Sequence, residues 1–448
     1  MEEIKYETKT VFKMSIPIFI ELLLQLLVGN IDQFMISQYS EVSVGAVGNA
    51  NQIINIVTIF LNVMCISTTI LVSQYIGAKN KKKISEVCTV STFGIVTISV
   101  IISILLITCS RKLFILLNVP DIILNEACNY LNIICGFIIV QGLYLVIAAA
   151  LRSYNLMKEV MFASIVMNIL NIVGNAILIN GLFGAPRLGI VGAAISTNIS
   201  KVIGLIIVII LLLRKTDARI KFKYINPFPA KTLKKVLSIG LPTGAEDLCY
   251  SLSQMCILTF INTFGTAVIA TKVYASMLAN VAYVYTIAIS AATQIVIGYL
   301  IGSNRTEKIE KRVWSTMKIS LLVSLTITLL IYFNSDFIFG LFTKDPEVLI
   351  LGKKIIFIEF FLEIGRAVNI VMVRCLLAIG DVVVPATVTG IFAWVVAVGL
   401  SYILGVRLGL GLVGVWIAMA IDECIRAIIF SIRFKSQKWL SKITLEVE

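Results

Sequence analysis

The chain is divided by apolar segments that are each long enough to cross a lipid bilayer, which requires about 20 mostly apolar residues. Only 14% of its 448 residues are charged, whereas a soluble domain carries about 25%. The sequence therefore predicts an all-α polytopic membrane protein with twelve transmembrane helices. Their approximate ranges are 11–36, 47–76, 87–109, 124–150, 160–182, 190–213, 236–261, 268–301, 313–334, 349–376, 385–405 and 410–433.

The basic residues, which give a formal net charge of +13, are concentrated in alternate connections between these segments. The connection 214–235 alone contains eight basic residues and one acidic residue, Asp217. An excess of Lys and Arg marks cytoplasmic loops, so both termini are predicted to be cytoplasmic. A nucleic-acid-binding groove would need a continuous basic patch instead, and no nucleic-acid partner is predicted. The chain contains no histidine, so proton chemistry must rest mainly on carboxylates.

The two halves of the chain repeat each other. At an offset of 225 residues, Pro17 aligns with Pro242 and Glu21 aligns with Glu246. Each half contains six segments, an even number, so both halves enter the membrane from the same side and form parallel repeats. We therefore predict two pseudo-symmetric six-helix bundles, with substrate and coupling sites in the cleft between them. The predicted limits are 1–213 for the N-terminal lobe, 214–235 for a basic cytoplasmic linker and 236–448 for the C-terminal lobe.

The first apolar segment carries three polar side chains on one narrow helix face. At about 100° per residue, Gln25 lies about 40° and Asp32 about 20° from Glu21. An ionised carboxylate in mid-membrane costs about 2.5–3.5 kcal/mol, so such groups face a cavity or a partner. The stripe is either a set of structural carboxylates satisfied by neighbouring helices or a binding site for protons or cations. Pro17 predicts a hinge beside it, because proline removes a helical hydrogen bond.

The C-terminal half has its own ionisable residues within apolar segments. Glu359, Glu363 and Arg366 share one helix face. They predict either a buried Glu363–Arg366 ion pair that locks the lobe or a role in substrate or proton handling. The others are Glu246 and Asp247, which follow the second predicted hinge at Pro242; Asp422, Glu423 and Arg426, a predicted structural salt-bridge cluster; and Lys272, a predicted snorkelling residue.

Five sequence features occur in a characteristic order along nearly the whole chain. They are the Pro17-to-Asp32 spacing, QYIGAKN at 74–80, LNIVGNAILINGLFGAPRLGIVGAAIST at 170–197, GD at 380–381 ahead of Pro385, and GLGLVGVWIAMAIDE at 409–423. Together they resemble the multidrug and toxic compound extrusion (MATE) family of secondary transporters. The resemblance implies a cation-coupled efflux antiporter whose two six-helix lobes form a V.

The resemblance also implies particular site residues. In the family, the first-helix aspartate, here Asp32, belongs to an N-lobe cation site. An asparagine and an acidic residue one turn apart on the fifth helix complete that site in many members. The matching positions here are Asn171 and Asn175, so the second acid is missing. Hard cations prefer charged oxygen ligands, so protonation of Asp32 is the simpler mechanism, with Na⁺ at Asp32 as the alternative. The acids Glu246, Asp247 and Glu363, the last with Arg366, are the candidates for a C-lobe site.

We therefore expect a secondary active antiporter that exports amphiphilic, often cationic organic compounds in exchange for H⁺ or Na⁺ by alternating access. The alternative is a lipid-linked saccharide flippase of the same superfamily, which twelve segments and few mid-membrane arginines argue against. An integral-membrane enzyme would need a nucleophile–base pair or a metal cluster, and a channel fits the parallel repeat less well. The expected setting is the plasma membrane of a bacterium, where the protein acts as a monomer without a cofactor beyond the coupling ion.

Overall fold

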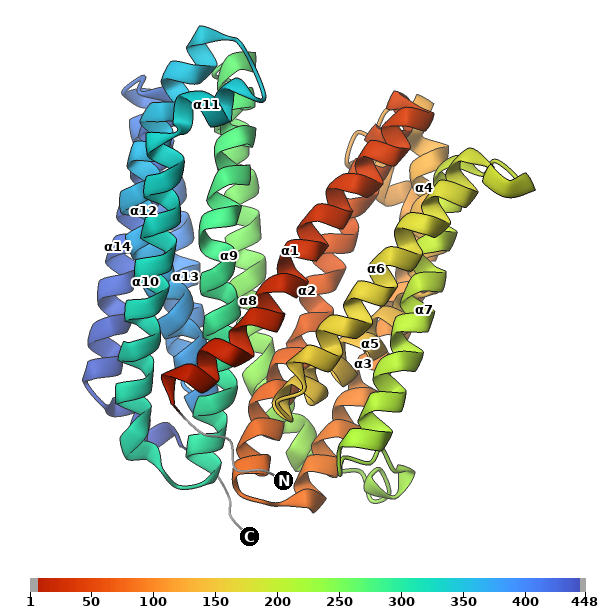
Figure 1. Cartoon of the computed structure of the whole chain (residues 1–448), viewed down its shortest axis with the longest axis vertical. Helices are drawn as coiled ribbons and strands as arrows, with labels where there is room; N and C mark the ends of the chain where they lie inside the picture. Colours follow the sequence, from red (N-terminus) through yellow and green to blue (C-terminus); the bar gives the residue numbers. More distant parts are fainter. Residues whose placement is uncertain (1–6, 444–448) are drawn as a thin grey trace. The chain divides into compact units, whose positions relative to one another are not determined.

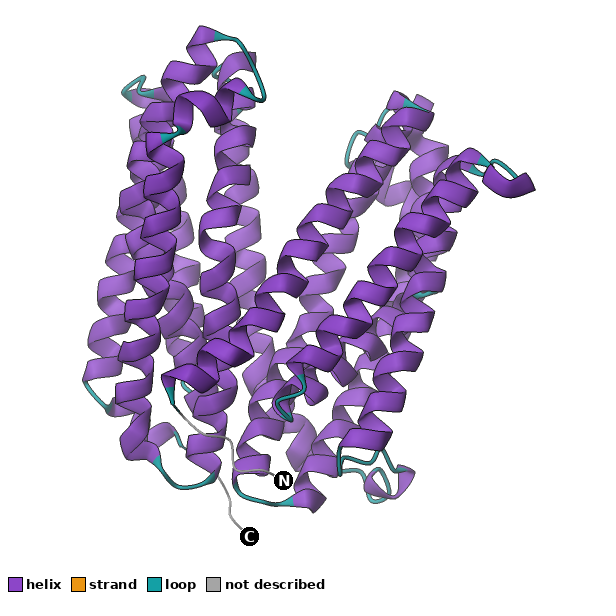
Figure 2. Ribbon diagram, viewed as in Figure 1, coloured by secondary structure: helices purple, strands orange, loops and turns teal. Residues whose placement is uncertain are grey.

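The computed structural model describes residues 7–443, in which helices are joined by short loops (Figure 2). The helices of the first half are α1 (Thr8–Tyr39), α2 (Glu41–Gly77), α3 (Lys81–Leu116), α4 (Asp121–Gly136), α5 (Ile138–Ser153), α6 (Met157–Asn180) and α7 (Gly189–Lys215). Those of the second half are α8 (Ala230–Ile261), α9 (Thr266–Gly302), α10 (Ile309–Phe333), α11 (Ser335–Gly340), α12 (Pro346–Ile379), α13 (Val383–Phe392) and α14 (Gly411–Lys435). After α13 the chain continues as π-helical segments at Ala393–Val398 and Ser401–Arg407.

Most of these helices can cross a membrane. Among residues 7–443, eight helices are long and apolar enough by length and composition, or nine if α4 and α5, which meet at a 48° bend, form one span. The helices α8, α12 and α14 have 32, 34 and 25 residues, and each carries ionisable side chains within its apolar stretch, such as Glu246, Glu363 and Asp422. Counting these three, the structure agrees with the twelve predicted spans. It is an all-α polytopic membrane protein.

The two halves contain the same series of helices. Helices α2 and α9 each have 37 residues, and their first and last residues are 225 positions apart. At an offset of 226 residues, the broken span α4–α5 corresponds to the single helix α12, whereas α3 corresponds to α10 followed by the short α11. Helix α7 corresponds to α14. The predicted repeat is therefore visible in helix length and order.

The turn chemistry of the motifs explains where several helices begin and end. After α2, the side chain of Asn80 accepts a 3.0 Å hydrogen bond from the backbone N–H of Lys83, which caps the start of α3. In α12, Asp345 caps the N-terminus with a 2.9 Å bond from the Glu347 N–H. Gly380 ends that helix in the left-handed region at φ 97°, where glycine has no steric penalty. The QYIGAKN and GD motifs are thus helix-end signals.

The chain forms two compact units. The N-terminal unit comprises residues 20–241, and the C-terminal unit comprises residues 242–448 together with the first part of the chain up to Phe19. One boundary between the units therefore falls within α1, two residues after Pro17. The second boundary falls within α8, directly before Pro242. The lobe and linker limits expected from the sequence stay a prediction, because compactness does not show which residues move together.

In the N-terminal unit, α2, α3 and α5 pack against one another, and α6 and α7 form a close pair (Figure 1). Helix α5 is almost enclosed, and its residues 146–151 are all buried. Gly142 permits this packing, because a Cβ there would lie 2.7 Å from the Ser99 hydroxyl oxygen of α3.

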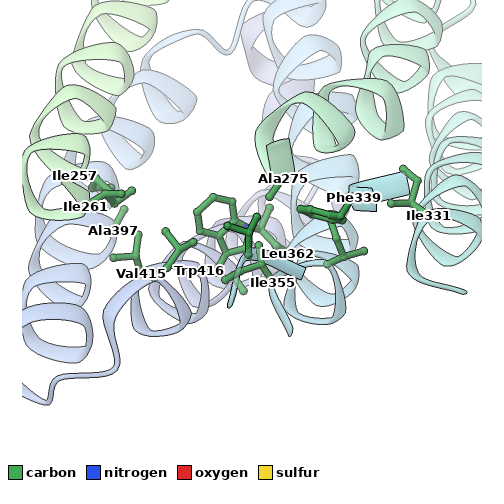
Figure 3. Packing of buried hydrophobic residues seen from close by; sticks show 14 residues of the cluster. Ile257, Ile261, Ala275, Ile331, Phe339, Ile355, Leu362, Ala397, Val415 and Trp416 are labelled. Atoms are coloured by element: carbon green, nitrogen blue, oxygen red, sulfur yellow. The ribbon is translucent and has the colours of Figure 1, made fainter. Parts of the chain in front are cut away.

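In the C-terminal unit, α12 packs against α9, α10 and α14 (Figure 1). The apolar core there includes Trp416 of α14 and Leu362 and Ile355 of α12 (Figure 3). Gly365 brings α12 close to α14, because a Cβ there would lie 2.6 Å from the backbone nitrogen of Cys424.

Polar contacts between connections show which loops share a side of each unit. Lys81, after α2, forms a 2.9 Å ion pair with Asp217, after α7. That hydrogen bond lowers the pKa of the Asp217 carboxyl. In the C-terminal unit, Asp381, after α12, forms a 2.8 Å ion pair with Arg433 near the end of α14. In each unit, the two connections joined by these ion pairs therefore lie on a common side.

Candidate functional site

The side chain of Asp32 meets α6 inside the N-terminal unit. The Asn175 amide Nδ2 donates a 2.7 Å hydrogen bond to Asp32 Oδ1. Asn175 is fully buried, whereas Asp32 is partly exposed. The carboxylate therefore has one firm neutral partner and one oxygen left for a proton, a cation or water. The first-helix acid and the fifth-segment asparagine named from the sequence are brought together.

Asn171, one turn before Asn175, joins α6 to α7. Its Nδ2 donates a 3.1 Å bond to the Thr197 hydroxyl, and its backbone carbonyl accepts a 3.0 Å bond from Ser196. These contacts leave some amide atoms without a partner. The Asn171 and Asn175 Oδ1 atoms and Asn168 Nδ2 are buried without a hydrogen bond among residues 7–443. Unpaired buried amides are costly, so this face of α6 is suited to bind a small polar species.

Lys201 is the functional candidate that the sequence reasoning missed. It lies on α7 one turn after Thr197, and its ammonium interacts electrostatically with Asp32. The two side chains form no direct ion pair in the part of the chain described. The sequence did contain a signal: Lys201 is the one charged residue within the apolar segment 190–213, and a charge within a span is a functional hypothesis by default. Asp32 therefore has a cationic neighbour.

Glu21 and Gln25, the other members of the predicted stripe, do not join this site. Glu21 is buried, and its Oε1 forms a 2.7 Å ion pair with Nη2 of Arg152 on α5. It lies eleven residues before Asp32, about 16 Å along the helix. Gln25 is exposed. Glu21 therefore has the environment of a structural carboxylate satisfied by a neighbouring helix.

In the C-terminal unit, the predicted Glu363–Arg366 ion pair is present and has a further partner. Arg366 Nη1 lies 2.9 Å from Glu363 Oε2 and 2.5 Å from Glu359 Oε1. Ser324 donates a 2.5 Å bond to Glu363, and the Trp416 indole donates a 2.7 Å bond to the second oxygen of Glu359. Each carboxylate is therefore held by α12 itself and by one neighbouring helix, α10 for Glu363 and α14 for Glu359.

A second charged cluster on α14 adjoins the first. Arg426 pairs with Asp422 at 2.6 Å and with Glu423 at 2.7 Å, as expected for a salt-bridge cluster. Glu423 also accepts a 2.5 Å bond from Asn369 of α12, and it interacts electrostatically with Arg366. The α12 and α14 clusters thus form one network.

The charges of this network do not balance. Its four carboxylates, Glu359, Glu363, Asp422 and Glu423, face two guanidinium groups, those of Arg366 and Arg426. Full ionisation would leave two uncompensated negative charges at buried positions, which is strongly unfavourable. The network is therefore suited to hold protons or to attract a cation.

Glu246 and Asp247 point in different directions from α8. Glu246 is buried, and its Oε1 accepts a 3.0 Å bond from Thr389 of α13, while its Oε2 has no partner among residues 7–443. Asp247 is exposed. Arg374 of α12 interacts electrostatically with both acids. Glu246 is therefore the one of the pair with a site-like environment.

The two predicted hinge residues both lie inside helices, Pro17 in α1 and Pro242 in α8. Each lies within two residues of a point at which the chain leaves one compact unit and enters the other. No cluster of three or more His, Cys, Asp or Glu side chains able to hold a metal ion occurs among residues 7–443.

Comparison with known proteins gives a consistent picture. A sequence model of the MatE family matches residues 17–177 and 242–403, so the match restarts 225 residues later, at the second helix proline. The chain is 36% identical over 437 residues to the uncharacterized transporter YisQ of Bacillus subtilis (strain 168), covering 97% of this chain and 96% of that protein. It is 26% identical over 451 residues to the probable multidrug resistance protein NorM of Thermotoga maritima, covering 100% and 96%. A crystal structure of MATE in the bent conformation matches with a TM-score of 0.89 and 23% identity, covering 97% of each chain.

Proposed function

This chain belongs to the MatE (MATE) family of membrane transporters, and from that premise we propose that it is an efflux antiporter. It expels amphiphilic organic compounds, cationic ones in particular, in exchange for protons. The family match covers both halves of the chain, and relatives such as the Thermotoga NorM carry the name probable multidrug resistance protein. The coupling ion and the residues that bind it are part of the proposal.

The observation that carries the coupling mechanism is the hydrogen bond between Asn175 and Asp32 together with the nearby charge of Lys201. With Asp32 ionised and Lys201 protonated, the site has no net charge, and the carboxylate is available to an organic cation. Protonation of Asp32 leaves the Lys201 ammonium as the uncompensated charge, which repels a cationic substrate. Proton binding and substrate binding thus oppose each other by one shared coupling free energy.

Protons suit this site better than Na⁺. A multidentate Na⁺ site is built from several charged oxygen ligands, whereas Asp32 has neutral amides beside it and a tethered cation nearby. The Lys201 ammonium supplies the positive charge that a bound metal ion would otherwise contribute. Na⁺ at Asp32 is therefore the disfavoured alternative.

The carboxylate network of the C-terminal unit is the proposed second proton-binding group. Its excess of carboxylates over guanidinium groups favours proton uptake, and Glu246 with its unpartnered oxygen adds another acceptor. In this proposal Pro17 and Pro242 act as hinges between the units. The cycle then alternates between states in which substrate or protons occupy the sites.

The proposed setting follows from the charge distribution. The protein is a multi-pass membrane protein. We place it in the bacterial plasma membrane with both termini in the cytoplasm, because the basic residues are concentrated in the connections that follow even-numbered spans. In a chain with twelve spans, these connections are on the same side of the membrane as both termini. A monomer suffices, since both repeats belong to one chain. Substrates are small amphiphilic compounds, and neither a cofactor nor a nucleic acid takes part.

The test is transport in proteoliposomes with separately imposed gradients. A fluorescent lipophilic cation such as ethidium is followed while either a proton gradient or a Na⁺ gradient is applied. We expect the proton gradient alone to drive transport in the wild type, and Asp32→Asn to abolish it while the protein stays folded. Transport driven equally well by Na⁺ alone, or undiminished in Asp32→Asn, would overturn the mechanism.

A further inference from the structure

A cavity of about 250 Å³ lies within the C-terminal unit between α8, α9 and α14. Its lining includes Lys272 of α9, Gln254 and Met255 of α8, and Trp416 and Met419 of α14. The volume is close to the lower end of the range of about 300–1,000 Å³ for ligand pockets. The cavity adjoins the apolar core of the unit, to which Trp416 also belongs (Figure 3).

The charge of this cavity is opposite to that expected for a binder of organic cations. Lys272 is the one ionisable residue in its lining. The Lys272 ammonium forms no ion pair or hydrogen bond among residues 7–443. The carboxylate of Glu359 does not belong to the lining; it accepts a hydrogen bond from the Trp416 indole and is paired with Arg366. A ligand in this space therefore meets a positive charge without a competing negative one.

The rest of the lining is suited to an apolar body. The thioethers of Met255 and Met419 adapt to irregular shapes, and the Trp416 ring offers a flat apolar surface. Gln254 and Ser276 add neutral hydrogen-bonding groups. An unpaired ammonium beside such walls complements a molecule with one acidic group and a compact hydrocarbon part.

The cavity is connected to the charged network of the same unit. Trp416 lines it and also donates a 2.7 Å hydrogen bond to Glu359, the partner of Arg366 at 2.5 Å. A bound molecule that moves the indole would therefore disturb a buried carboxylate.

We propose that this cavity binds amphiphilic anions, with the carboxylate, sulfonate or phosphate group paired to Lys272. This site extends the ligands of the protein beyond the cations of the proposed function. The proposal concerns ligand binding only, so it holds whatever the direction of transport and whichever ion drives transport. The acidic group comes either from a soluble amphiphile or from an anionic lipid headgroup.

The experiment compares three probes that share one hydrocarbon chain, namely octanoate, octanol and octylammonium. Binding of radiolabelled octanoate and octanol to the wild-type protein in phosphatidylcholine nanodiscs is measured by scintillation proximity, with octylammonium as competitor. We expect octanoate to bind and octylammonium not to displace it. Lys272→Met should weaken octanoate binding at least tenfold while octanol binding and the melting temperature stay unchanged. Lys272→Arg should retain octanoate binding.

Lys353→Met is the matched control, because Lys353 is an exposed lysine of the same unit that pairs with Asp336; it should leave octanoate binding unchanged. Repeating the measurement in phosphatidylglycerol nanodiscs separates the two sources of the acidic group. Octanoate binding that is lost there assigns the site to a lipid headgroup, and binding that persists assigns it to soluble anions. If octanoate binds no better than octanol, or if Lys272→Met binds octanoate like the wild type, Lys272 merely snorkels and the proposal is wrong.

Discussion

Asn175 Nδ2 lies 2.7 Å from Asp32 Oδ1 and joins two helices whose contacting residues are 143 positions apart. The bond fixes one carboxylate oxygen and leaves the other free to change its protonation state. Lys201 adds a charge that the amide cannot supply. In the proposed mechanism, these three side chains form a site in the N-terminal unit whose net charge changes with one proton.

Removing the Lys201 ammonium should change which ion binds at Asp32. In Lys201→Met, the Asp32 carboxylate has no counter-charge, and the unpartnered amide oxygens of Asn171 and Asn175 become ligands for Na⁺. We expect Na⁺ to raise the melting temperature of this variant but not that of the wild type; at 100 times the Kd, the stabilisation would be about 2.7 kcal/mol. Adding Asp32→Asn to Lys201→Met should remove the Na⁺ effect. An equal effect of Na⁺ on the wild type would show that Lys201 does not act as the site's cation.

The Glu21–Arg152 ion pair should be structural. Arg152→Met leaves the buried Glu21 carboxylate without its counter-charge, with an expected loss of about 3–5 kcal/mol, whereas the double variant Glu21→Gln/Arg152→Met should be nearly neutral. Thermal unfolding in detergent measures this coupling. The exposed Lys353–Asp336 pair is the control, and its coupling should not exceed about 1 kcal/mol. Additive effects of the Glu21 and Arg152 substitutions would contradict the assignment.

Arg366 should be more sensitive to substitution than either of its partners. Arg366→Met removes the counter-charge of both Glu359 and Glu363, whereas Glu363→Gln leaves the Glu359–Arg366 contact in place. Loss of a buried partner costs about 3–5 kcal/mol. We therefore expect a lower melting temperature for Arg366→Met than for Glu363→Gln, and strong coupling in a double-mutant cycle. Simple additivity of Glu363→Gln and Arg366→Met would show that they do not interact.

The hinge assignment predicts opposite effects of Pro17→Ala on stability and transport. Alanine restores the N–H that proline lacks, and an interior proline costs about 3 kcal/mol in a helix, so the variant should melt at a higher temperature. Efflux should slow, because α1 bends less readily where it passes between the units. Pro120→Ala, at the N-cap of α4, is the control and should leave efflux unchanged. Efflux by Pro17→Ala at the wild-type rate would place the hinge elsewhere.

The sequence predicted features that depend on local spacing. The spans and the repeat follow from hydropathy and from the recurrence of Pro17 at Pro242. The Glu363–Arg366 pair follows from a three-residue spacing on one helix. The link between Asp32 and the asparagines of α6 came from family resemblance rather than from spacing.

Contacts between helices could not be predicted from periodicity. Periodicity gives the face of the helix on which a side chain lies, but it does not identify the neighbouring helix that this face contacts. Arg152 is 131 residues from Glu21, and Trp416 is 57 residues from Glu359. Helical periodicity placed Glu21 and Asp32 on one face, yet their separation along α1 puts them in different environments.

Proton release on substrate binding is the decisive measurement for the role of Asp32. The purified protein is held in weak buffer with a pH indicator dye, and ethidium is added at saturating concentration. Asp32→Asn is tested under the same conditions, and its binding of ethidium is verified separately. If substrate and proton compete at Asp32, the wild type releases protons and Asp32→Asn releases fewer. Equal proton release from the two proteins would contradict coupling at Asp32 and assign it to the carboxylates of the C-terminal unit.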